Sequence, residues 1–147
     1  MADQLIPYVD RLESDVQTSG TTLVSCTDLA FTLAASSYYA FLFMVLFQTE
    51  GPLQGVKLAL LGPANPNLLV YTIKIPTSLT SFIEQMRRAY DDPVTSQTID
   101  SSNPGLAVIE GLVFTGVTAG DLMVRFASSN NNQATLKAGS AGNLWLW

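Results

Sequence analysis

The hydrophobic pattern of the chain is clearest over residues 38–47, which contain no charged residue and no Gly or Pro. Counted with a period of two, one side carries Tyr38, Ala40, Leu42, Met44 and Leu46, and the other carries Tyr39, Phe41, Phe43, Val45 and Phe47. Both sides are apolar, and the aromatic content favours a strand over a helix. We therefore predict a central strand that is covered on both sides, by the domain's own core on one and by a helix or a neighbouring subunit on the other.

Shorter segments with strand-like patterns lie before and after this one, separated by turn residues such as those at 62–67. The predicted strands are 22–26, 29–34, 56–61, 69–75, 106–115, 121–127, 134–137 and 143–147.

Two of these segments suggest a hairpin with a defined register. If 106–115 pairs antiparallel with 121–127, Ile109 lies opposite Phe126 on a fully apolar face. The same register places Glu110 opposite Arg125 on the other face, as a structural ion pair across the strands. A shift by one residue loses both features, so the pattern predicts this register.

The period changes between Pro76 and Asp92. Leu79, Phe82, Ile83, Met86 and Tyr90 fall at helical spacing, and Ser81 with Glu84 fits a capping box before Pro93 ends the segment. The pattern predicts one short helix, whose apolar stripe covers a face of the sheet.

Residues 1–20 differ from the rest of the chain, because they are rich in acidic residues and interrupted by Pro7. We predict an extended N-terminal arm over 1–20, followed by a β-sandwich domain over 21–147. The apolar residues of this arm are candidates for partner binding: Leu5, Ile6, Tyr8, Val9 and Leu12. A frayed terminus is the alternative interpretation.

The expected fold is mainly β. Short strands with regular turn signals, one short helix and an extended arm fit an antiparallel, jelly-roll-like β-sandwich.

Composition narrows the possible functions. Charged residues make up 13% of the chain, against roughly 25% in typical soluble proteins, and the net charge is −5. No basic cluster exceeds Arg87-Arg88, which disfavours nucleic-acid binding. The chain contains no His, which excludes Ser-His-Asp and Cys-His sites within one chain and His-containing zinc sites. We expect neither enzymatic activity nor a cofactor.

Residues 29–47 also carry no charge over nearly the length of a membrane span. Ser36-Ser37 lie in the middle, the flanks are Asp28 and Glu50, and the segment alternates like two strands. We therefore expect no membrane span, and the first residues do not fit a signal peptide.

Three further features have two interpretations each. Asp91, Asp92 and Asp100 lie in one predicted loop and could bind calcium, but their spacing fits no EF-hand and favours a solvated loop. Trp145 and Trp147 could stack on sugars, although packing in the core or between subunits is the commoner use. Cys26 is expected to be an inert, buried thiol.

Three segments together resemble small β-sandwich virion proteins of tailed bacteriophages, a group that includes capsid decoration (cement) proteins and head or tail fibre modules. The segments are 39–43 leading to 55–60, then 109–113 with 119–127, and Gly139-Ser140. The resemblance implies a role in virion assembly and carries no catalytic residues.

The function expected from this resemblance is a capsid decoration protein. Such a protein binds the outside of the shell formed by the major capsid protein of the same virus, after synthesis in the host cytoplasm. The alternative is a fibre module that recognises host-surface glycans. The excess of apolar strand surface also predicts a homo-oligomer, with a homotrimer favoured.

Overall fold

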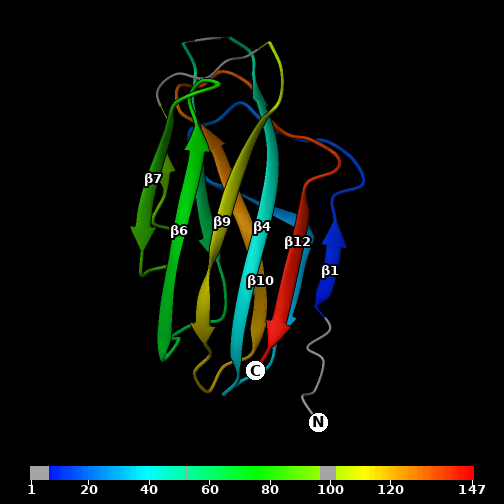
Figure 1. Ribbon diagram of the computed structural model, residues 1–147, viewed down its shortest axis with the longest axis vertical. Helices are drawn as coiled ribbons and strands as arrows, with labels where there is room; N and C mark the ends of the chain where they lie inside the picture. The colour runs from blue at the N-terminus through cyan, green and yellow to red at the C-terminus, as the bar shows by residue number, and fades with distance from the viewer. Residues whose placement is uncertain (1–6, 52, 97–101) are drawn as a thin grey trace.

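The computed structural model describes residues 7–51, 53–96 and 102–147, which form twelve antiparallel strands in two sheets (Figure 1). The large sheet has eight strands: β1 Tyr8–Arg11, β2 Val16–Thr18, β4 Tyr38–Thr49, β6 Leu68–Pro76, β7 Phe82–Arg87, β9 Gly105–Phe114, β11 Ala134–Leu136 and β12 Ala141–Leu146. The small sheet has four strands: β3 Val24–Leu33, β5 Val56–Leu61, β8 Val94–Thr95 and β10 Gly120–Ser128.

The strand order is that of a jelly roll. From β3 to β10 the chain passes back and forth between the sheets, which places β3-β10-β5-β8 in one and β4-β9-β6-β7 in the other. The remaining strands extend the large sheet beyond β4, where β12 and β11 pair with β4, and β1 and β2 pair with those in turn. The expected mainly β, antiparallel class is confirmed, and the described residues are all-β.

Strand β4 lies near the middle of the large sheet, as predicted. It pairs with β9 along ten residues, from Tyr38 opposite Phe114 to Phe47 opposite Gly105. Its odd-numbered side chains from Tyr39 to Phe47 are buried in one core shared by both sheets. Across this core the rings of Phe31 from β3 and Phe43 from β4 lie 5.7 Å apart.

The uncharged segment 29–47 thus forms the end of β3, a turn and most of β4. Ser36 has a positive φ of 51° in that turn, and its N–H donates to the Gly116 carbonyl. Within the described residues no helix is long and apolar enough to cross a membrane.

The predicted helix between Pro76 and Asp92 is wrong. Residues 82–87 form β7, which pairs with β6 from Pro76 opposite Phe82 to Tyr71 opposite Arg87. The Ser78 hydroxyl accepts the N–H groups of Thr80 and Ser81, so this serine stabilises the turn and the expected capping box is not formed. Pairing with the edge of β6 outweighs a helical spacing that was carried by few residues.

The predicted hairpin is also wrong, because β9 and β10 belong to different sheets. Glu110 lies between Leu42 and Thr72 in the large sheet, whereas Arg125 lies between Ser25 and Ala59 in the small sheet. Arg125 instead forms an ion pair with Asp91, with 2.6 Å between Nη1 and Oδ1. The alternation within each strand was correct, but the connection between them crosses from one sheet to the other.

Much of the segment expected to form an arm lies in the large sheet as β1 and β2. Leu12, between these strands, is fully buried, and it exchanges backbone hydrogen bonds with Gly139 and Ser140. It is therefore a core residue and is not available to a partner. Tyr8 and Val9 are exposed, and Leu5 and Ile6 lie outside the described residues.

The Gly139-Ser140 motif lies where the strand beside β4 is interrupted, between β11 and β12. Gly139 has a φ of 95°, a left-handed conformation that glycine adopts without strain. The buried Ser140 hydroxyl accepts the N–H of Leu46 at 2.9 Å and donates to the Lys137 carbonyl at 2.9 Å. The side chain thus replaces backbone pairing at the interruption.

Candidate functional site

The outward side of the large sheet is the most unusual surface of the described chain. We call it the apolar face; in Figure 1 the strands that carry it run side by side from β7 to β12. Its apolar side chains are Tyr38, Ala40, Leu42, Met44, Leu46, Leu68, Val70, Phe82, Met86, Leu106, Val108, Leu112, Phe114 and Trp145. Antiparallel sheets that face solvent normally alternate apolar inward and polar outward residues.

The registers of the strands bring these side chains together. One row across the sheet runs Val70, Leu112, Ala40, Trp145, from β6 through β9 and β4 to β12. Several members are large and half exposed, including Leu112 at 46%, Leu106 at 50% and Phe82 at 53%. No segment of the described chain covers them, so the expectation of a covering helix fails and the face lies open.

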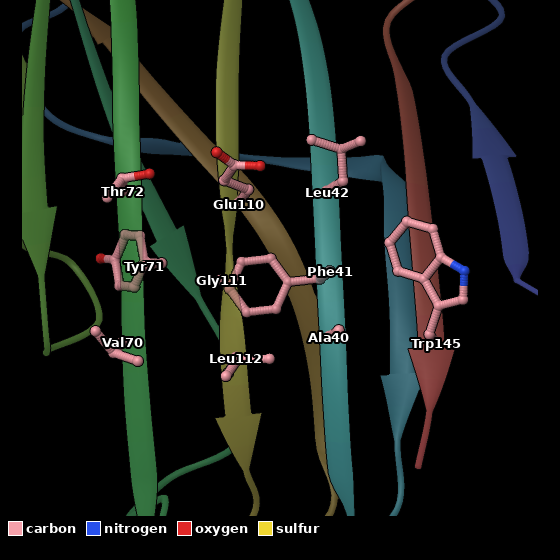
Figure 2. Close-up of a pocket in the computed structure, with 10 residues that line it drawn as sticks. All are labelled: Ala40, Phe41, Leu42, Val70, Tyr71, Thr72, Glu110, Gly111, Leu112 and Trp145. Atoms are coloured by element: carbon pink, nitrogen blue, oxygen red, sulfur yellow. The ribbon is translucent and has the colours of Figure 1, made fainter.

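A shallow hollow of about 480 Å³ lies in the middle of this face (Figure 2). Its floor is low because Ala40 is small, and Leu42, Leu112 and Trp145 rise around it. Below the floor, Gly111 leaves no room for a Cβ, which would approach the Val70 carbonyl oxygen to 2.3 Å. On that inner side the rings of Phe41 and Tyr71 lie 6.4 Å apart, on the strands that flank Gly111.

Few charges interrupt the apolar face. Glu110 is exposed near its centre and forms none of the ion pairs found among the described residues. Lys74, one row away on β6, lies 3.9 Å from the centre of the Phe82 ring. Glu84 lies opposite Lys74 on β7. The face therefore holds two anions and one cation, and none of the three forms an ion pair among the described residues.

The two ends of the face differ in polarity. At one end Tyr38 stacks on Phe114 with ring centres 3.9 Å apart, beside an apolar hollow that Leu68 and Trp147 also line. At the other end β4 continues into Gln48, which lies opposite Thr135, and Thr135 lies opposite Gln17. The apolar area is thus bounded along the strands.

The aromatic candidates at the end of the sequence lie on this surface. Trp145 lines the central hollow, and Trp147 is 72% exposed beside Tyr38. Both are placed to meet a partner or a ligand rather than the core. The sequence pattern left these possibilities open.

The aspartates considered for calcium have other partners. Asp91 pairs with Arg125 and Asp92 pairs with Arg87, while Asp100 lies outside the described residues. Within the described ranges, no group of three or more Asp, Glu, Cys or His side chains could hold a metal ion.

The perturbed titratable groups are structural. Burial raises the pKa of the Cys26 thiol to about 11 and that of Tyr90 to about 12. Burial also raises the pKa of Tyr71, whose hydroxyl donates to the Ala89 carbonyl. These groups are held protonated inside the fold.

Sequence reasoning found the outward apolar side of β4 but missed the breadth of the face. Phe82 and Met86 join it because β7 is a strand, and Leu106 and Leu112 join it because β9 pairs with β4. The available signal was the apolar residues at even positions in 68–70 and, apart from Glu110, in 106–114, beside the even positions of 38–46.

No protein-family model matches the chain, and no curated protein sequence matches it. Among solved structures the chain is similar to the Yersinia pseudotuberculosis-derived mitogen, with 12% identity and a TM-score of 0.36 over 72% of this chain and 85% of that one. It is also similar to the VP2 subviral particle of infectious bursal disease virus, with 13% identity and a TM-score of 0.29 over 99% of this chain and 42% of that one.

A third similar structure is a family two carbohydrate esterase from Cellvibrio japonicus, with 10% identity and a TM-score of 0.28 over 92% of this chain and 35% of that one. The chain thus spans less than half the length of the viral protein and of the esterase. All these TM-scores are low, and no argument about function rests on them.

Proposed function

We propose that this protein is a structural component of a virion, namely a decoration (cement) protein on the outside of a bacteriophage capsid, and that it is not an enzyme. The observation that carries the proposal is the broad apolar face, which is open across the described chain. A surface of this kind is typical of proteins that act by assembling with others. The resemblance of 39–43, 109–113 and 119–127 to phage virion proteins supports the phage assignment.

In this proposal the partner is the shell formed by the major capsid protein of the same virus, and the decorating unit is a homo-oligomer. Tyr8 and Val9 are exposed on the edge strand β1 and supply apolar contacts to the shell. Leu5 and Ile6 belong to the same proposed contact by sequence, and Leu12 anchors the segment in the core. Neither nucleic acid nor membrane has a role.

Binding to shells that lack the protein tests the proposal. Purified protein is added to undecorated shells, and the amount that sediments with them is measured. We expect saturable binding and shells that withstand higher temperature. Absence of binding at micromolar protein would contradict the proposal.

A fibre module that binds glycans is the second candidate, favoured by Trp145 in the central hollow. Glu110 and Thr72 line the same hollow, so an aromatic surface lies near polar groups, as sugar recognition requires. Binding of host-surface glycans by the wild type and not by Trp145→Ala would favour this candidate. Equal, negligible binding by both would exclude it.

A further inference from the structure

We propose that a second copy of this chain covers the apolar face, so that the protein self-associates through the outward side of its large sheet. The inference rests on the proposed function, since it names the partner of the surface that carries that proposal. Three properties of the face indicate that the molecule covering it is a copy of the same chain: its size, its charges and its shape.

The first property is size. Five neighbouring strands, from β7 to β12, carry the face. At about 4.8 Å between strands and about 3.3 Å per residue, they present roughly 24 Å by 28 Å, or roughly 700 Å². A standard specific interface buries about 800 Å² on each partner. The area of the face is therefore within the range of standard specific interfaces, about 600–1,000 Å² on each partner.

The second property is charge. Glu110 lies near the centre of the face and forms no ion pair among the described residues, and burying an unpaired carboxylate is strongly destabilising. The covering surface must therefore bring a cation. Lys74 lies on the same face, exposed and opposite Glu84, and forms no ion pair among the described residues, so a second copy can supply the cation that the first copy needs. The reciprocal pair follows from symmetry.

The third property is shape. The hollow above Ala40 needs a projecting apolar side chain to fill it. The same face carries such side chains, including Leu106, Phe82 and Met86, each at least half exposed. Projection and hollow thus occur together on one surface, as self-complementary packing requires.

Sedimentation equilibrium of the full chain, without any shell, tests the inference. We expect the wild type to be a dimer at micromolar concentration, because a face that pairs reciprocally with its own copy closes with two chains. Leu112→Glu, on the apolar face, should weaken association at least tenfold. The matched control Met123→Glu places the same charge on the outward side of the small sheet and should associate like the wild type. Circular dichroism checks that all three chains fold.

A monomeric wild type would overturn the inference, and so would Leu112→Glu that associates as strongly as Met123→Glu. A folded monomer of Leu112→Glu beside an oligomeric control supports it. If Leu112→Glu does not fold, Leu106→Glu places the same charge on the same face and takes its place in the comparison.

A charge exchange tests the pairing of Glu110 with Lys74. The variants Glu110→Lys and Lys74→Glu each place like charges together in their own oligomers, so each alone should associate more weakly than the wild type. When the two are mixed, opposite charges meet at both positions, and association should recover. Recovery on mixing requires contact between chains. No recovery would overturn this pairing.

The same proteins separate the inference from the proposed function. A wild type that is monomeric but saturates undecorated shells overturns the inference and leaves the proposed function standing. A wild type that self-associates through the apolar face but does not bind shells supports the inference and overturns the proposed function.

Discussion

The two sheets of this protein share one core but differ in their outward sides. On the small sheet the outward polar groups find partners within the chain: Thr32 donates to Asp121, Arg125 pairs with Asp91, and Lys57 donates to the Thr21 carbonyl. On the large sheet the outward groups are mainly apolar, and the central Glu110 has no ion-pair partner among the described residues. The outward side of the small sheet is therefore suited to contact with water, whereas the apolar outward side of the large sheet is suited to contact with another surface.

Because the two sheets share one core, removing a buried ring from the inward side of either sheet should lower the free energy of unfolding by a similar amount. Phe43→Ala in the large sheet and Phe126→Ala in the small sheet both remove a fully buried ring. Each should reduce the free energy of unfolding by about 3–5 kcal/mol, because each leaves a cavity in the same core. Urea unfolding measures both. A loss several-fold smaller in one sheet would show that the two sheets do not share one core.

The next largest difference in stability is expected between the loss of a buried hydroxyl and the loss of an exposed one. Ser140→Ala removes the buried acceptor of the Leu46 N–H in the large sheet, which should cost about 1–3 kcal/mol. Thr32→Val removes an exposed hydrogen bond on the small sheet, and surface changes of this kind usually stay within about 0.5 kcal/mol. Equal losses in urea unfolding would mean that the interruption between β11 and β12 does not depend on Ser140.

The sequence alone predicted some of the features on which these expectations depend and missed others. The alternation of residues 38–47 was enough to predict a strand with two apolar sides, because its aromatic content favours a strand over a helix. The antiparallel, jelly-roll-like class followed from many short strands with regular turns. Both are local properties of the sequence pattern.

Three expectations failed for a common reason, which is that pairing partners are set by distant parts of the chain. Residues 82–87 carry apolar side chains at spacings that fit a helix or a strand, and the free edge of β6 decides the matter. The loop after β9 has the length of a hairpin but crosses between the sheets. β1 pairs with β12 across almost the whole sequence, which no local pattern reveals.

The corrected partner of Arg125 gives a smaller, specific prediction. A double-mutant cycle of Arg125→Ala with Asp91→Ala should give a coupling of about 0.5–1 kcal/mol, since the pair is partly exposed. The cycle of Arg125→Ala with Glu110→Ala should give a coupling near zero, because these residues lie in different sheets. A larger coupling with Glu110 would restore the rejected hairpin.

The smallest effect concerns Cys26 on the inward side of the small sheet. Burial raises its pKa from 9.0 to about 11, so the unfolded chain loses the thiol proton first as pH rises. The stability from the buried neutral thiol is therefore complete below about pH 9 and falls between pH 9 and 11. Cys26→Ala should reduce this alkaline loss in urea unfolding at each pH. An unchanged pH dependence would assign the loss to other groups, such as the buried Tyr90.

The central claim is that the outward side of the large sheet is covered by another molecule while that of the small sheet is not. Methionines report on both, since Met44 and Met86 lie on the apolar face and Met123 lies on the outward side of the small sheet. Oxidation by peroxide, followed by mass spectrometry of peptides, compares the wild type with Leu112→Glu. The account predicts slower oxidation of Met44 and Met86 in the wild type than in the variant, with Met123 equal in both. Equal rates at Met44 and Met86 in the two proteins would contradict it.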